Sequence, residues 1–135
     1  MSELESFLRW ALNDPLVELL LARSFLTKTQ FEVLLIDTYS KRMGEILSEK
    51  HRRRILRKTS KGAFFRSLKQ AKNNVSRALF TVLLLGYVGV LDTPELLPYV
   101  ELGSRLKALA EERDSEEIRE ALVKLIEGSV RELTS

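Results

Sequence analysis

The sequence predicts an all-α protein: a compact single-domain bundle of about six to seven helices over residues 1–135. Apolar residues recur at helical spacing along the chain, and no long alternating β-branched run occurs. Six Gly and three Pro leave few positions for the many turns that a sheet protein needs. The length fits one domain. Within it we expect a basic helix-turn-helix-like unit at 26–80, a long central helix, and C-terminal helices at 94–135.

Capping signals divide the first third of the chain into three helices. Ser2 with Glu5, and Thr27 with Gln30, have capping-box spacing. Asp14-Pro15 is typical of a helix start, and Gly44 suits the end of the third helix. The apolar residues expected to pack are Leu4, Phe7, Leu8, Ala11 and Leu12 in the first helix, Leu16, Val17, Leu19, Leu20 and Leu21 in the second, and Phe31, Leu34, Leu35 and Tyr39 in the third.

Two helices are expected in the middle of the chain. Ser48 suits the start of a basic helix from Glu49 to about Arg57, and Thr59 or Ser60 suits the cap of a long helix. The expected core face of that long helix is Phe65, Leu68, Ala71 (or Lys72), Val75, Leu79, Val82 and Gly86. Residues 78–91 are apolar all round, but 14 residues are fewer than the roughly 20 that span a bilayer. We therefore predict a buried central helix and no membrane partner.

Two more helices are expected near the C-terminus. Asp92-Thr93-Pro94 separates the long helix from one at about 95–113, and Asp114 or Ser115 suits the cap of the last helix. The apolar stripe of that last helix is Ile118, Leu122, Leu125, Ile126, Val130 and Leu133. It covers two heptads at most, which favours packing on the protein's own core over a coiled coil. A homodimer through the C-terminal helices stays open.

The charge is distributed very unevenly along the chain. The net charge is +3, but residues 41–72 carry 12 Lys and Arg against 2 Glu, whereas residues 1–40 and 95–135 are both acidic. A block of this kind often binds polyanions, although a basic face can also be only solvated. We predict nucleic acid as the partner, with DNA favoured and RNA possible.

Other chemistry is not indicated. The chain has no Cys and a single His, His51, so neither a thiol nucleophile nor a Cys- or His-rich metal site is expected. No phosphate-binding glycine loop or hydrolase motif occurs, and the acidic residues at 111–117 bracket a helix junction. We therefore expect no enzyme activity, no cofactor and no metal. The start lacks a signal-peptide pattern, which predicts a cytoplasmic protein. Few Asn and Gln together with 30% charged residues indicate a thermophile.

The basic block has the element order of a helix-turn-helix: a capped apolar helix, a short basic helix, a break, and a long basic-faced helix. In that motif the second helix enters the major groove with its N-terminal residues at base edges. The N–H groups behind a Ser60 cap would favour a phosphate. The candidate nucleic-acid-binding residues are Lys50, Arg52, Arg53, Arg54, Arg57, Lys58, Ser60, Lys61, Arg66, Lys69, Asn73 and Arg77.

A family resemblance supports this interpretation. Leu26, Thr27, Gln30, Val33 and Leu34, followed by Ser60, Gly62, Arg66, Leu68 and Ala71, resemble the region-4 helix-turn-helix of sigma factors and its archaeal relatives. The resemblance covers residues 26–77 and implies a DNA-binding protein of the transcription-regulator type. Two departures disfavour standard major-groove docking. Residues 49–54 are charged where the family buries small side chains, and the long helix runs well past a typical recognition helix.

Two alternatives remain. A single-stranded DNA- or RNA-binding protein, similar to the small helical single-strand binders of thermophilic archaea, would stack bases on exposed aromatics beside a basic groove. Phe64 and Phe65 are the candidates for such stacking. The other alternative is a helical adaptor or assembly subunit, in which residues 78–91 and the C-terminal stripe serve oligomerisation.

Overall fold

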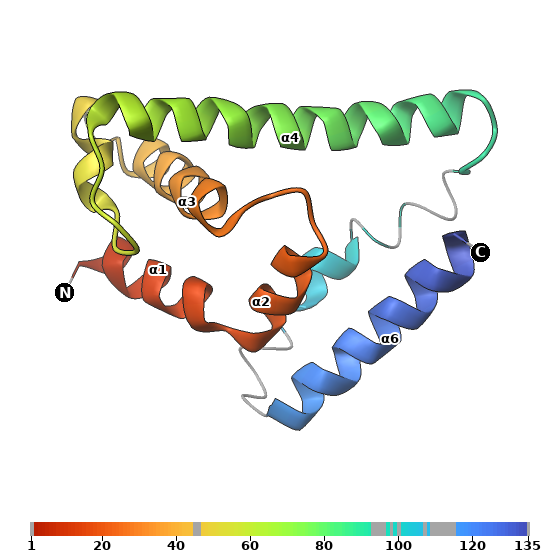
Figure 1. Cartoon of the computed structure of the whole chain (residues 1–135). Coiled ribbons are helices and arrows are strands. Elements are labelled where there is room, and N and C mark those ends of the chain that lie inside the picture. The colour runs from red at the N-terminus through yellow and green to blue at the C-terminus, as the bar shows by residue number, and fades with distance from the viewer. Residues whose placement is uncertain are drawn as a thin grey trace. The chain divides into compact units, whose positions relative to one another are not determined.

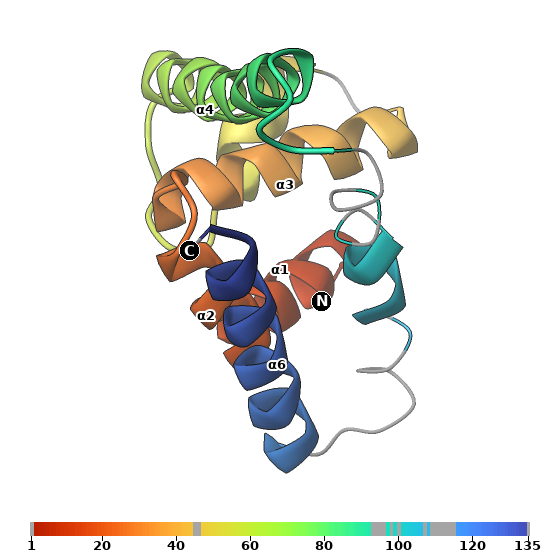
Figure 2. The same cartoon turned by 90° about the vertical axis from the view of Figure 1, so that its right-hand side faces the viewer.

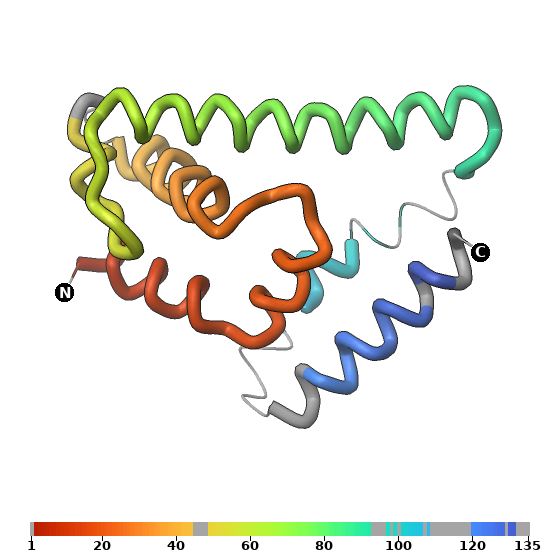
Figure 3. Tube along the Cα trace, viewed as in Figure 1, coloured from red at the N-terminus to blue at the C-terminus, as the bar shows by residue number. Residues whose placement is uncertain are grey.

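A computed structural model of the chain describes residues 2–44, 47–92, 97, 99, 101–106, 108 and 116–134. All regular secondary structure in these residues is helical (Figures 1 and 3), which confirms the predicted all-α class. The chain divides into two compact units, Met1–Ala78 and Leu79–Ser135, and the boundary falls inside a helix. Each unit is described by itself. The prediction of a single domain is not tested by this division, because a compact unit can be part of a domain.

The first two helices begin at the predicted caps. Helix α1 (Glu3–Asn13) follows Ser2, whose side chain accepts a hydrogen bond from the Glu5 N–H at 3.1 Å. Helix α2 (Pro15–Ala22) follows Asp14, whose carboxylate accepts from the Val17 N–H at 3.0 Å. The predicted burial of α2 is wrong for most of its residues. Leu16 is its only buried side chain, because a helix of two turns, although it is apolar except for Glu18, offers only one side to the core.

Helix α3 (Lys28–Met43) has both ends where the sequence predicts them. The Gln30 N–H donates to the Thr27 hydroxyl, and the Thr27 N–H donates to the Gln30 side chain, both at 3.1 Å. The helix ends at Gly44, whose φ of 69° lies in the left-handed region that glycine adopts without strain. These two local signals determine the length of α3.

The predicted basic helix at 49–57 is wrong in its bounds and type. The structure has a 3₁₀ helix, η1 (Leu47–Arg53), followed by residues 54–60 without helix. The N–H groups of Ile55 and Leu56, which a longer helix would use internally, instead donate to the Glu32 carboxylate at 2.8 and 2.9 Å. A tertiary contact therefore replaces the last turn of the expected helix.

Helix α4 (Lys61–Tyr87) is the long helix, and Ser60 is its cap. The Ser60 hydroxyl accepts from the Ala63 N–H at 3.2 Å, and its carbonyl accepts from the Phe64 N–H at 3.0 Å. At the other end the Gly89 N–H donates to the Gly86 carbonyl, and the φ of Gly89 is 83°. The chain thus leaves the helix through a left-handed residue, as many helices do.

The core of the first unit lies between three helices. Figures 1 and 2 both show α3 between α1 and the first part of α4. The buried members of this core are Leu4, Leu8 and Leu12 of α1, Val33 and Ile36 of α3, and Phe64 and Leu68 of α4. Phe64 is thus the central ring, whereas Phe65, which helical spacing favoured, packs at the edge and meets Phe64 edge-on at 5.3 Å.

The prediction that residues 78–91 form a buried helix is wrong. Helical structure continues to Tyr87, but most of the large apolar side chains between Leu79 and Val90 are between 40% and 92% exposed, and Leu85 and Leu91 are only half-buried. Only a helix surrounded by other elements buries its whole circumference. No helix in the described residues is long and apolar enough to cross a membrane.

The last helix, α6 (Glu116–Thr134), has close to its expected span. Val123 is its most buried described residue, whereas Leu125 of the predicted stripe is 65% exposed. The predicted caps Asp114 and Ser115 lie outside the described residues. Of the helix expected at 95–113, residues 97, 99, 101–106 and 108 are described, and all are helical.

Candidate nucleic-acid interface

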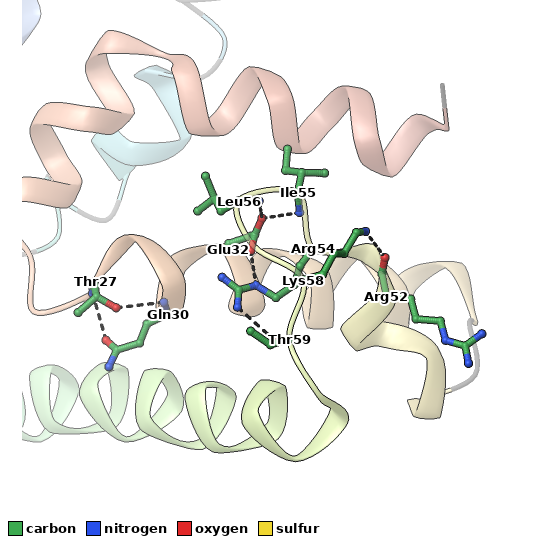
Figure 4. Close-up of polar contacts among 9 residues, drawn as sticks. All are labelled: Thr27, Gln30, Glu32, Arg52, Arg54, Ile55, Leu56, Lys58 and Thr59. Atoms are coloured by element: carbon green, nitrogen blue, oxygen red, sulfur yellow. Dashed lines mark hydrogen bonds and ion pairs between the residues drawn. The ribbon is translucent and has the colours of Figure 1, made fainter.

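Glu32 of α3 is a buried carboxylate that holds residues 54–59 in place. It accepts hydrogen bonds from the Arg54 side chain and from the N–H groups of Ile55 and Leu56 (Figure 4). Arg54 in turn donates to the Thr59 hydroxyl at 3.3 Å, just before the start of α4. Burial of a carboxylate is tolerated when its oxygens are paired and hydrogen-bonded, as they are at Glu32.

Asp37 is a second buried carboxylate of α3, and it forms ion pairs with lysines from three elements. The amino groups of Lys50, Lys41 and Lys72 lie 2.8, 3.1 and 3.3 Å from its oxygens. Burial by itself would raise the pKa of the Asp37 carboxyl. The hydrogen bonds from Lys50 and Lys41, with the charges of Lys50 and Lys72, outweigh that effect and hold the pKa below its usual value. The hydrogen bond to Asp37 likewise raises the pKa of Lys41.

Three predicted site residues are buried and therefore cannot contact a nucleic acid. Lys50 is 1% exposed and Arg54 is 2% exposed, because their charges are paired with Asp37 and Glu32 inside the protein. The fully buried Phe64 cannot stack on a base, because its ring belongs to the core. Phe65 is half-buried at the edge of that core. The assignment of Lys50 and Arg54 as contact residues, and of Phe64 as a stacking residue, is corrected accordingly.

The other predicted residues reach the surface. Arg53 is half-buried, and the exposed ones are Arg52, Arg57, Lys58, Ser60, Lys61, Arg66, Lys69, Asn73 and Arg77. Helix α4 contributes five cations over 27 residues and contains no Asp or Glu. Arg66, Lys69, Asn73 and Arg77 recur at spacings of three and four residues, which puts them on one face over about 16 Å of helix. We call these four residues the α4 polar stripe.

Three of the predicted cations also meet at a pocket of the first unit. The pocket has a volume of about 140 Å³. It is lined by Ser2, Leu4, Glu5, Arg52, Arg53, Ile55 and Lys58. The Lys58 amino group is fixed there, since it donates to the Arg52 carbonyl at 2.6 Å (Figure 4). Arg52 forms a surface ion pair with Glu49 at 3.0 Å, and Glu5 forms one with Arg9 at 3.2 Å. The lining of the pocket thus includes three cations and one carboxylate, that of Glu5.

Phe25 is a candidate contact residue that sequence analysis missed. It lies in the connection between α2 and α3 and is 83% exposed. The Asn74 side chain of α4 donates to the Phe25 carbonyl at 3.1 Å and to the Gln30 side chain at 3.0 Å. The Phe25 backbone is therefore held next to the helix that carries the stripe, and its ring is exposed there. The only signal in the sequence is a Phe outside any apolar periodicity, next to a predicted cap.

No protein-family model, curated protein or solved structure matches this chain. The resemblance to the sigma-factor helix-turn-helix and its archaeal relatives, like the thermophilic origin, therefore stays a prediction. Among the described residues, no group of three or more His, Cys, Asp or Glu could hold a metal ion. The candidate site is a positively charged surface, and a surface of this kind attracts anions.

Proposed function

We propose that this protein is a non-enzymatic nucleic-acid-binding protein of the DNA-binding, transcription-regulator type, which contacts phosphates through the α4 polar stripe and the cations just before α4. The observation that carries the proposal is the charge on α4. The helix carries five exposed cations and no Asp or Glu, and one of the five, Lys72, pairs with Asp37 of α3. A surface of this kind attracts a polyphosphate at long range.

The buried carboxylates strengthen this proposal. The carboxylates of Glu32 and Asp37 are buried, and they form ion pairs inside the protein with Arg54 and Lys50. These two acids precede the basic block in sequence, and neither presents its charge at the surface. Within the block Glu49 is exposed and pairs with Arg52, but most of the Lys and Arg side chains are exposed as well.

Fluorescence anisotropy with labelled duplex DNA, single-stranded DNA and RNA, each at two salt concentrations, tests the proposal. We expect binding that weakens steeply with salt, because every phosphate contact releases counterions. Arg66→Ala with Lys69→Ala should reduce the slope of log affinity against log salt by about 2, roughly one per lost phosphate contact.

Lys124→Ala with Arg131→Ala on α6 is the matched control. It removes the same two residue types and the same net charge from exposed positions of the other unit. It should leave the slope close to that of the unchanged protein. Equal effects of the two double variants would mean that only net charge matters, and no binding to any of the three probes at low salt would refute the proposal.

Single-stranded nucleic acid is the second candidate, and the exposure of Phe25 favours it. An exposed aromatic ring, on a backbone held next to a helix rich in Lys and Arg, is an arrangement on which single-stranded bases stack. Phe25→Ala should then weaken single-strand binding by about 1–3 kcal/mol, the usual contribution of one stacked base. Phe25→Tyr keeps a ring and should retain affinity. Equal losses for duplex and single strand, or no loss at all, would exclude a stacking role for Phe25.

A further inference from the structure

The last two turns of α4 and the residues just after them carry a large exposed apolar surface that the proposed function does not use. We call it the α4 apolar face. It consists of Leu79, Phe80, Val82, Leu83, Leu84, Tyr87, Val88 and Val90, each between 40% and 92% exposed. Two exposed rings of roughly 150–250 Å² each and six aliphatic side chains at these exposed fractions present an apolar surface on the order of 800 Å². The largest patch on a typical monomer is about 300–600 Å².

Helical spacing gathers five of these side chains on one side of α4, with Val82 and Val88 at either edge and Val90 beyond the end of the helix. Leu79, Leu83 and Tyr87 follow one another at intervals of four residues, and Phe80 and Leu84 form a parallel row beside them. The two rows make a ridge of aliphatic and aromatic groups about 12 Å long. A ridge of this kind can pack into the groove of another helix.

We propose that this ridge is the contact between two copies of the chain, whose α4 helices pair antiparallel about Leu83. The area agrees with this occupant, because each partner contributes about 800 Å² to a standard interface. The pairing is self-complementary, as a two-fold contact requires. Leu79 of one copy meets the region of Tyr87 of the other, and the reverse, with Leu83 at the centre.

Charge decides the direction of the pairing. No charged residue lies between Arg77 and Asp92, so the contact itself is uncharged. In an antiparallel pair, Arg77 comes to the C-terminal end of the partner's helix, whose last carbonyls carry partial negative charge, with Asp92 just beyond it. A parallel pair would instead set the two polar stripes, with Arg66, Lys69 and Arg77, side by side. Like charges therefore disfavour the parallel arrangement.

The expected result is a dimer in sedimentation velocity at micromolar concentrations, converted to a monomer by Leu83→Glu. Leu125→Glu on α6 is the matched control, since both leucines are 65% exposed and the chemical change is identical. The control should remain dimeric, with an unchanged helical signal in circular dichroism for both variants. A monomer for the unchanged chain at every concentration would overturn the proposal, as would dissociation by Leu125→Glu alone. Binding of a monomeric chain to anionic lipid vesicles would point to a membrane surface instead.

Single-cysteine variants test the direction, because the natural chain has no Cys. Leu83→Cys lies at the two-fold centre and should form an intermolecular disulfide under mild oxidation. Leu79→Cys should not, since its counterpart lies about 12 Å away along the antiparallel pair, beyond the reach of a disulfide. Efficient cross-linking of both variants would indicate a parallel pair and overturn the antiparallel arrangement. The dimer does not depend on nucleic-acid binding, and neither readout uses a nucleic acid.

Discussion

The two ends of α4 show how one helix can present two different surfaces. From Arg66 to Arg77 its exposed face carries the polar stripe, and at the same helical spacing Phe80, Leu84 and Tyr87 continue it as an apolar surface. The first part lies over a core built with α1 and α3, through Phe64 and Leu68. The comparison teaches that hydrophobicity along a helix does not by itself indicate burial. The more polar part is the one that is anchored.

The anchoring of the basic end depends on charge as well as on apolar packing. Glu32 and Asp37 reach the segment that precedes α4 and pair with Arg54 and Lys50. The apolar end cannot form ion pairs of this kind, because no charged residue lies between Arg77 and Asp92. Variants that remove one side chain from either end therefore test how much each end contributes to the free energy of unfolding.

Glu32→Ala should have the largest effect on stability. It leaves the Arg54 guanidinium buried without its carboxylate, and it removes the acceptor of the N–H groups of Ile55 and Leu56. We expect a loss of about 3–5 kcal/mol in the free energy of unfolding, measured by urea denaturation. Glu49→Ala is the control, because its ion pair with Arg52 is largely exposed and is worth about 0–1 kcal/mol. Similar losses for the two variants would mean that Glu32 does not anchor the basic segment.

Truncating one leucine at each end of α4 gives the most direct comparison. Leu68→Ala removes a core side chain that is 5% exposed and should cost about 2–5 kcal/mol. Leu79→Ala, at 60% exposure, should change stability by less than about 0.5 kcal/mol. Both are best measured in a Leu83→Glu background, so that association does not contribute. A large loss for Leu79→Ala there would show that the apolar end is covered within its own chain.

The smallest expected effect is on the pH dependence of stability. The folded pKa of Asp37 lies below its unfolded value of 3.8, so the unfolded state binds more protons between the two values. The contribution of Asp37 is therefore complete above its unfolded pKa and is lost as the pH falls through the folded pKa. Urea denaturation at a series of acidic pH values should show this loss, and Asp37→Asn should flatten the curve in that window. An unchanged curve in the variant would contradict the assignment.

The ends of the helices were predictable because their signals are local. The hydroxyls of Ser2, Thr27 and Ser60 and the carboxylate of Asp14 cap the N–H groups a few residues ahead, and Gly44 adopts the left-handed conformation that ends α3. Each of these contacts joins residues within one turn. The end of the basic helix was not predictable, because the groups that stop it bind Glu32, more than twenty residues earlier.

The candidate site was predictable in its charge but not in its members. The excess of Lys and Arg at 41–72 and the periodicity of the α4 polar stripe are properties of the sequence. Which cations are used internally depends on α3, where Glu32 and Asp37 are fully or almost fully buried although both are charged. The spacing of apolar residues, on which burial was predicted, does not detect buried charged residues such as these. Phe25 was missed for the opposite reason, since it is apolar but remains at the surface.

The sequence by itself determined the helical class, the caps and the position of the basic block, because these follow from neighbouring residues and from composition. Only the tertiary structure decided which charges are buried and which apolar residues are exposed. Burial depends on what lies opposite a side chain, and those partners come from distant parts of the chain. Lys50 is charged but buried, because it pairs with Asp37, whereas Leu83 is apolar but exposed.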